Sequence, residues 1–238
     1  MGLRRWKAKT RRGLLGIASI LAILPNLLAA SDLELRKRCS LRFGSLEAQA
    51  RLDRQKQILR AYRNAFKKST SQVGVVEEAC LYQNQRCQSN VIRLFDHMKA
   101  QIPNLEKSEF EVINISFKGG PNFDDADEYF PVLQGRLGYV KGERVKKVHW
   151  KYHVALKYGD FILDLDNTDR PRAYPFKTYV KKLFDPSERR YLYYYTVPGD
   201  VYLSTPADQA NKKVFHFKIY RNYKGIRLDS VLDPDHRP

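Results

Sequence analysis

Residues 148–168, VHWKYHVALKYGDFILDLDNT, contain two alternating runs of apolar and polar residues on either side of the pair Gly159-Asp160. A Gly-Asp pair between two such runs predicts a β-hairpin with a two-residue turn. Successive side chains of a strand point to opposite faces of the sheet, so the apolar residues of one parity form a core face. These residues are Val154, Leu156, Tyr158, Phe161, Leu163 and Leu165.

The position of the turn determines which polar residues of the hairpin face each other. With the Gly-Asp pair at the turn, His153 is opposite Asp166 and diagonal to Asp164. A turn one residue earlier places Asp164 opposite His153 instead. Both registers bring an imidazole next to a carboxylate, which is an arrangement that acid–base chemistry uses. The alternative interpretation is an ordinary solvated polar face that also includes Lys151 and Lys157.

The chain is strongly basic, and the distribution of its charge limits what it can bind. Its 238 residues carry a formal net charge of +17, which by itself suggests a nucleic-acid partner. The excess lies at the front, because six of the first 12 residues are Lys or Arg and residues 31–72 hold 11 Lys or Arg against four acids. Beyond residue 72 the charges nearly balance. We therefore expect no nucleic acid as a partner.

Residues 1–30 have the pattern of an export signal. The cationic stretch MGLRRWKAKTRR precedes an apolar run, and the sequence AAS at residues 29–31 is typical of a cleavage site. A proline and an asparagine within the apolar run disfavour a membrane-spanning helix, and a retained membrane anchor is the alternative. Residues 10–15, TRRGLL, also resemble the twin-arginine export signal of bacteria. The leader predicts an exported protein, periplasmic or secreted.

The cysteines point to a free thiol rather than to a disulfide framework. Cys39, Cys80 and Cys87 are an odd number for an exported chain, so at least one is free or bonds outside the chain. Three cysteines in 238 residues are too few for a disulfide scaffold. No His/Cys spacing matches a zinc site, and no glycine-rich phosphate loop is present. We therefore expect neither a metal ion nor an organic cofactor.

Residues 31–72 are predicted to form a basic helical extension in front of a larger domain over residues 73–238. Within the extension, residues 46–68 place apolar side chains at helical spacing opposite a densely basic face, and Ser45 is a candidate cap. The basic face is either solvated, with the apolar stripe packed on the body, or a contact surface for an acidic partner or anionic lipid. The stripe consists of Leu52, Leu59, Tyr62 and Phe66.

Cys87 comes at the beginning of a second predicted helix. From it onward, Val91, Leu94, Phe95 and Met98 recur at helical spacing. A helix N-terminus lowers the pKa of a thiol and offers backbone N–H groups to a developing oxyanion. This position suits a cysteine nucleophile. The alternative role for a free cysteine is that of a small buried apolar residue.

Most of the remaining chain is predicted to form strands. EFEVINISF alternates clearly, and RRYLYYYTVPGDVYLS and VFHFKIYRNY are rich in residues that favour strands. GGPNFDDADEYF is an acidic loop that lacks the ligand spacing of a calcium loop, so we expect it to be solvated. Helices followed by a run of strands favour an α+β fold over a doubly wound one.

Several collinear segments carry a family resemblance: residues 80–82 (CLY), 87–94 (CQSNVIRL), 150–154 (WKYHV), 164–166 (DLD), 175–180 (PFKTYV) and 199–203 (GDVYL). Together they resemble the protein N-terminal glutamine amidohydrolases, which are cysteine enzymes of papain-like and transglutaminase-like architecture. Each motif is short, and their shared order over residues 80–203 makes a chance match implausible. The resemblance implies an α+β fold in which a nucleophilic cysteine begins a helix packed on an antiparallel sheet that carries histidine and aspartate.

Transferred residue by residue, the resemblance implies Cys87 as nucleophile, His153 as base and acid, and Asp164 as the carboxylate that orients the histidine. It thus favours Asp164, whereas the Gly-Asp turn places Asp166 opposite His153. The catalytic domain implied is residues 73–238. Further candidates for supporting the site or binding substrate are Asp166, Asn90, Tyr152 and Trp150.

The implied activity is hydrolysis of the side-chain amide of glutamine in a protein or peptide, at its N-terminus, through a thioester that releases ammonia. Lys151 replaces an acidic residue of the family motif, which reverses a charge near the site. A cysteine peptidase, a transglutaminase or an internal-glutamine deamidase uses the same three residues. A non-enzymatic exported binding module is the remaining alternative, and it predicts a disulfide between Cys80 and Cys87. The sequence indicates no oligomeric state.

Overall fold

The computed structural model describes residues 46–68, 86–125, 127–133, 139–140, 143–144, 148–166, 172–210 and 212–233. The chain divides into two compact units, residues 1–55 and 56–238. The predicted leader, Ser45, Cys39, Cys80 and the predicted boundary between residues 72 and 73 lie outside the described residues. Among the helices that the structure describes, none is both long and apolar enough to cross a membrane.

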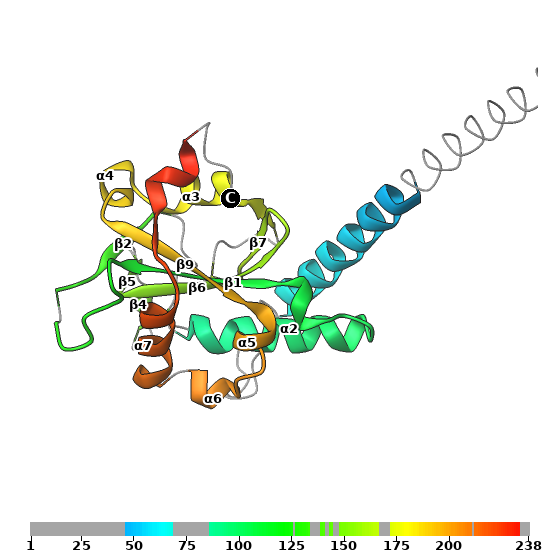
Figure 1. Cartoon of the computed structure of the whole chain (residues 1–238), viewed down its shortest axis with the longest axis horizontal. Helices are drawn as coiled ribbons and strands as arrows, with labels where there is room; N and C mark the ends of the chain where they lie inside the picture. The colour runs from blue at the N-terminus through cyan, green and yellow to red at the C-terminus, as the bar shows by residue number, and fades with distance from the viewer. Residues whose placement is uncertain are drawn as a thin grey trace, which may run out of the picture. The chain divides into compact units, whose positions relative to one another are not determined.

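A six-stranded sheet forms the centre of the second unit, with the strand order β10-β9-β1-β6-β7-β8 (Figure 1). All of its neighbouring strands pair antiparallel. With helices beside it, this sheet makes the unit an α+β fold, as the sequence predicts. The strands are β1 (Glu111–Phe117), β6 (Tyr152–Tyr158), β7 (Phe161–Leu163), β8 (Tyr174–Pro175), β9 (Leu192–Pro198) and β10 (Ile226–Arg227). Two small sheets pair β2 (Phe130–Val132) with β5 (Val148–Trp150) and β3 (Tyr139–Val140) with β4 (Glu143–Arg144).

The predicted hairpin is β6 and β7, and its register is the one that the Gly-Asp turn requires. Leu156 pairs with Leu163 and Tyr158 pairs with Phe161. Gly159 has a φ of 53°, a left-handed conformation that explains the glycine at the turn. β7 ends at Leu163, so the ladder stops before it reaches either aspartate.

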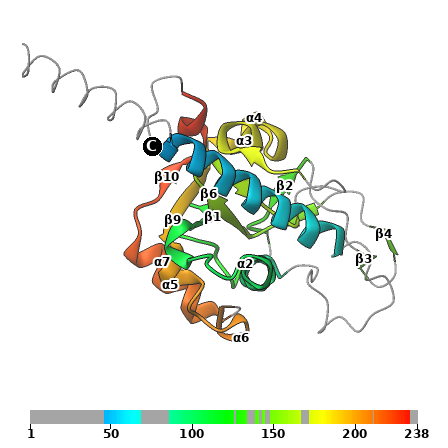
Figure 2. The same ribbon diagram turned by 90° about the vertical axis from the view of Figure 1, so that its right-hand side faces the viewer.

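Helices cover both faces of the sheet, as Figures 1 and 2 show. One face packs against α2, α5, α6 and α7, and its buried cluster includes the predicted core residues Val154, Leu156, Leu163 and Leu165. The other face packs against α3, β2 and η3 through a second buried cluster. The helices are α2 (Cys87–Gln101), α3 (Phe176–Leu183), α4 (Pro186–Arg189), α5 (Gly199–Tyr202), α6 (Ala207–Ala210) and α7 (Lys213–Asn222), with 3-10 turns η2 (Lys107–Glu109) and η3 (Leu228–Leu232).

The prediction of a strand at VFHFKIYRNY is wrong, because this segment forms α7. Its buried residues are His216, Ile219 and Tyr220, which follow helical rather than alternating spacing. Packing of this stripe outweighs the strand preference of its Val, Phe, Ile and Tyr residues. Within RRYLYYYTVPGDVYLS, the strand covers Leu192–Pro198, and α5 begins at Gly199.

A helix spans residues 46–68, as the sequence predicts. Its residues from 56 onward belong to the second unit, where they add to the cluster that contains α2. The buried side chains are Ile58, Ala61, Tyr62, Ala65 and Phe66. Of the predicted stripe, Tyr62 and Phe66 are therefore buried in the second unit, and Leu59 packs partly buried against the same cluster.

Candidate active site

Cys87 is the first residue of α2. Arg86 precedes it and provides no side-chain cap, and the first backbone bond of the helix runs from the N–H of Asn90 to the carbonyl of Arg86. The N–H groups at the start of a helix have no partner within it and carry a partial positive charge. The Cys87 side chain is a free buried thiol, whose S–H donates to Gln88 Oε1 at 3.4 Å. A thiol is thus placed where a helix favours negative charge.

His153 lies on β6 and is fully buried. Its Nε2 is 2.9 Å from Oδ2 of Asp164, which is also buried. The indole ring of Trp150 stacks on the imidazole, with 3.8 Å between ring centroids and 10° between planes. The other ring nitrogen, Nδ1, has no hydrogen bond of normal geometry among the described residues. Asp164 therefore fixes the orientation of His153 and leaves Nδ1 available for chemistry.

Asp164, and not Asp166, contacts His153 because β7 has already ended. Asp164 Oδ1 accepts the backbone N–H of Asp166 at 2.9 Å, and this bond turns the chain away from the ladder. Tyr179 of α3 donates its hydroxyl to Asp164 Oδ2 at 2.7 Å. Tyr62 donates its hydroxyl to the backbone carbonyl of Asp164 at 2.8 Å. The hairpin therefore has the register that the Gly-Asp turn predicts, and His153 nevertheless contacts Asp164, as the resemblance implies.

The charges of the site favour a protonated His153. Burial lowers the pKa of His153, but the buried carboxylate of Asp164 and its hydrogen bond outweigh burial and raise the pKa to about 10. Burial raises the pKa of the Cys87 thiol, and His153 and the backbone of Val154 act in the opposite direction. Cys87 and His153 thus lie close enough for each to shift the pKa of the other. The raised pKa favours a protonated imidazole of His153 beside the Cys87 thiol.

The remaining predicted candidates also gather around Cys87. The Tyr152 hydroxyl accepts a hydrogen bond from Gln88 Nε2, so Gln88 bridges Tyr152 and the thiol. Asn90, one turn along α2, donates its side-chain amide to Asp166 Oδ2 at 3.5 Å. The charge of Asp166 contributes to raising the pKa of Cys87, after burial. The structure therefore brings all of the predicted site residues together.

Three contributors to the site were not assigned a role from the sequence. Tyr179 appears in the resemblance only as part of the motif PFKTYV, and nothing in this motif indicates that its side chain reaches Asp164. The sequence predicts Tyr62 only as a residue of the apolar stripe, and it places Gln88 only as the neighbour of Cys87. A buried tyrosine needs a partner for its hydroxyl, which is the one general signal that could have drawn attention to Tyr62 and Tyr179.

The ammonium group of Lys151 binds the acidic loop that follows β1. Its Nζ donates to the backbone carbonyls of Asp125 at 2.6 Å and Asn122 at 3.4 Å, and it lies 5.0 Å from the ring centroid of Tyr129. Asp124 of the same loop pairs with Lys213 of α7 at 3.0 Å. The described part of the loop is largely exposed, as the sequence predicts, and it also binds two lysines of this chain.

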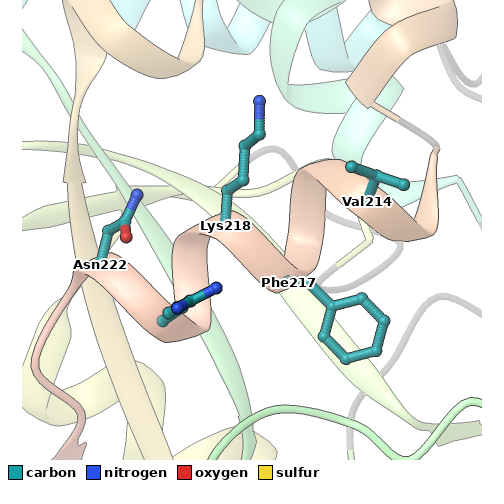
Figure 3. A pocket seen from close by; sticks show the side chains of 5 residues that line it. Val214, Phe217, Lys218 and Asn222 are labelled. Atoms are coloured by element: carbon teal, nitrogen blue, oxygen red, sulfur yellow. The ribbon is translucent and has the colours of Figure 1, made fainter.

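A shallow depression of about 520 Å³ lies on the outer side of α7 and is shown in Figure 3. It is lined by Val214, Phe217, Lys218, Arg221 and Asn222, so it does not include the cysteine, histidine or aspartate described above. Within the described ranges, no group of three or more His, Cys, Asp or Glu side chains is arranged to hold a metal ion.

Comparison of the chain with protein-family models gives no match, and comparison with curated proteins gives none either. The case for a function therefore depends on the residues of the site and on their geometry.

Proposed function

We propose that this chain is a glutamine side-chain amidohydrolase that acts on N-terminal glutamine of proteins or peptides through Cys87, His153 and Asp164. The observation that carries the proposal is the placement of His153: its Nε2 is 2.9 Å from Oδ2 of Asp164, and the Cys87 thiol lies close enough that each group shifts the pKa of the other. The proposal includes a papain-like or transglutaminase-like arrangement, in which the nucleophile begins a helix and the base lies on the sheet.

The first half of the reaction forms a thioester. Loss of one proton from the Cys87–His153 pair leaves a thiolate beside an imidazolium. The sulfur attacks the carboxamide carbon, so a C–S bond forms and the carbonyl oxygen becomes an oxyanion. The N–H groups at the start of α2 stabilise this oxyanion. His153 then gives the Nδ1 proton to the amide nitrogen, the C–N bond breaks, and ammonia leaves.

The second half hydrolyses the thioester. His153, now neutral at Nδ1, accepts a proton from water while the water oxygen attacks the thioester carbon. The C–S bond then breaks, Cys87 leaves as a thiolate beside the imidazolium, and the substrate side chain is released as a carboxylic acid that loses its proton to solvent to give glutamate. Asp164 neither gains nor loses a proton during the reaction, because its role is to hold the imidazole and to stabilise its positive charge.

The same three residues also serve cysteine peptidases, transglutaminases and deamidases of internal glutamine, so the substrate has to be tested directly. We would incubate the full, reduced chain with one peptide that begins with glutamine and a second that carries glutamine internally. We expect ammonia release and conversion of amide to acid in the first peptide only. Both peptides should remain uncut and uncrosslinked.

Cys87→Ala is the control, and it should abolish the release of ammonia. Cys87-dependent deamidation of the internal glutamine would replace the proposal with that of a general protein deamidase. Peptide cleavage or crosslinking to an amine would replace it with a peptidase or a transglutaminase. No reaction with either peptide would contradict the enzymatic proposal and favour the binding module.

A further inference from the structure

Residues 209–227 carry a local excess of positive charge that the proposed reaction does not use. This stretch holds six Lys or Arg residues and no Asp or Glu, although the chain beyond residue 72 is nearly balanced in charge. Most of the stretch forms α7, which buries His216, Ile219 and Tyr220. The outer face of the helix is exposed and consists of Lys213, Val214, Phe217, Lys218, Arg221 and Asn222.

Two adjoining depressions lie on this outer face. The first, of about 520 Å³, is lined by Val214, Phe217, Lys218, Arg221 and Asn222 (Figure 3). The second, of about 400 Å³, shares Val214 and Lys218 with the first and is also lined by Gln209, Lys212 and Phe215. Among the described residues, no acidic side chain lines either depression. The residues that line the two depressions form one basic surface, which we call the α7 surface.

Two apolar side chains of the α7 surface are in contact with water. Val214 is 66% exposed and Phe217 is 48% exposed, and both project from α7 close to Lys218 (Figure 3). Single exposed apolar residues are ordinary, whereas neighbouring ones in a depression with charged residues beside them are typical of a binding site. An apolar side chain of a partner would therefore be buried at this point.

The cations of the α7 surface lack countercharges. Within the part of the chain that the structure describes, Lys212, Lys218 and Arg221 form no ion pair. Lys213 differs from them, because it pairs with Asp124 of the acidic loop at 3.0 Å and so neutralises that carboxylate. A ligand that carries several carboxylates would meet three uncompensated positive charges, which makes it complementary to this surface.

The shape and charge of the α7 surface favour a peptide over a membrane or a nucleic acid. A lipid bilayer buries side chains that project into it, whereas a depression accepts a side chain from the partner. Three unpaired cations are also fewer than the roughly six to ten phosphate contacts of a strongly salt-dependent DNA-binding protein. The combination of cations with exposed apolar groups fits a peptide that has both carboxylates and an apolar residue.

Aromatic contacts lead from the α7 surface to the proposed nucleophile. The ring of Phe217 is 5.7 Å from that of Phe123, which is 5.9 Å from that of Tyr152. The Tyr152 hydroxyl accepts a hydrogen bond from Gln88, which also accepts one from the Cys87 thiol. An extended peptide spans about 3.4 Å per residue, so a substrate that reacts at the thiol reaches the α7 surface roughly five residues later.

We propose that the α7 surface binds an acidic segment of the protein substrate, roughly five residues after its N-terminal glutamine. Carboxylates of this segment pair with Lys212, Lys218 and Arg221, and an apolar side chain enters the depression beside Val214 and Phe217. The surface thereby selects substrates with such a segment over those without one. This inference rests on the proposed function, since it names the class of substrate that is brought to the thiol.

The first test measures binding in a full chain that carries Cys87→Ala and therefore cannot turn over the substrate. Two fluorescent peptides begin with glutamine and differ only about five residues later, where one carries Asp-Glu-Leu-Glu-Asp and the other Ser-Ser-Leu-Ser-Ser. We expect the acidic peptide to bind about tenfold more tightly in fluorescence anisotropy, the combined effect of three exposed ion pairs. Added salt should reduce this preference, because it screens exposed charges.

Charge reversal shows whether the preference belongs to the α7 surface. Lys218→Glu combined with Arg221→Glu should abolish it. The matched control is Lys177→Glu combined with Lys181→Glu on α3, which packs on the other face of the sheet, and it should keep the preference. Both variants change the net charge equally and place one glutamate in the last turn of a helix, so their unfolding midpoints should shift equally and slightly. Loss of the preference in both variants, or in neither, would overturn the proposal.

Vesicles of phosphatidylglycerol and a single-stranded DNA are the competing ligands for the same measurement. Binding of the acidic peptide with the expected preference supports the proposal. If vesicles or DNA bind through Lys218 and Arg221 and the acidic peptide shows no preference, the surface belongs to that other ligand and the proposal is wrong.

Turnover by the unsubstituted chain distinguishes this proposal from the proposed function. If both are correct, the acidic peptide should have a lower KM than the serine peptide at a similar kcat. Deamidation of both peptides at equal kcat/KM and with equal affinities would retain the enzyme and reject the docking surface. Preferential binding of the acidic peptide, lost in the α7 variant, without any turnover would retain the docking surface and reject the enzyme.

Discussion

Two buried histidines in this molecule have opposite electrostatic environments. His153 is held by the carboxylate of Asp164 and stacked on Trp150, and its pKa is raised to about 10. His216 is surrounded by aromatic rings, and burial lowers its pKa to about 4. Burial alone removes charge from an imidazole, whereas burial beside a carboxylate preserves it. A single partner therefore decides which of the two histidines can handle protons near Cys87.

The largest effect is expected from a substitution that gives His153 an environment without a carboxylate, like that of His216. Asp164→Asn removes the countercharge, so the pKa of His153 should fall and the thiolate–imidazolium pair should become less stable. We expect turnover to fall by about 10³- to 10⁴-fold, as the loss of an orienting carboxylate does in other triads. The pH profile of turnover, measured by ammonia release, should shift with it.

Asp166→Asn is the matched control for this change. It leaves the backbone bond to Asp164 intact, keeps an amide oxygen that can accept the hydrogen bond from Asn90, and removes a charge near Cys87, so turnover should change by less than about tenfold. Loss of activity in Asp166→Asn with retention in Asp164→Asn would show that Asp166, and not Asp164, orients His153.

A smaller effect concerns stability at low pH. The pKa of His216 is about 4 in the folded chain and about 6.5 in an unfolded one, so the unfolded state binds a proton first. The stabilisation from its neutral form is complete above pH 6.5 and is lost as the pH falls through 4. Its size is on the order of 3 kcal/mol, and denaturant unfolding at several pH values measures it.

His216→Phe should remove this part of the acid sensitivity, because a phenyl ring fits among the same aromatic neighbours and does not titrate. His153 has the opposite sign, since its raised pKa contributes stability that is complete below pH 6.5 and is lost as the pH rises through 10. An unchanged acid profile in His216→Phe would show that other groups dominate between pH 6.5 and 4.

The smallest effect is expected at Tyr62, whose hydroxyl binds the backbone carbonyl of Asp164. Tyr62→Phe removes the hydrogen bond to the buried carbonyl of Asp164, and the free energy of unfolding should fall by about 1–2 kcal/mol. Turnover should fall only slightly, because Tyr179 still holds the carboxylate. Tyr191→Phe, on an exposed side chain, serves as the control for denaturant unfolding. Equal stabilities would mean that the Tyr62 bond contributes nothing.

The sequence predicted local features of the site better than the contacts that hold Asp164 in place. Alternation and the Gly-Asp pair determined the hairpin register, and helical spacing placed Cys87 at the start of α2. The end of β7 at Leu163 was not predictable, because it depends on a hydrogen bond between Asp164 and Asp166 that alternation does not encode. Local composition also failed at α7.

Long-range contacts were the other limit. Tyr62 reaches the carbonyl of a residue 102 positions away, and Tyr179 reaches the same aspartate from α3. No spacing rule connects residues so far apart in the chain. The resemblance selected Asp164 because it compares whole motifs, whereas a register argument extends a regular ladder beyond the point where this ladder ends.

The stacking of Trp150 on His153 gives the site an optical signal. The chain has two tryptophans, and the other, Trp6, lies outside the described residues. In Trp6→Phe, all indole fluorescence comes from the ring that lies 3.8 Å from the imidazole. A protonated imidazole quenches indole emission, so the emission brightens when His153 loses its proton. A fluorescence titration therefore reports the charge of the proposed base in the intact protein, without a substrate.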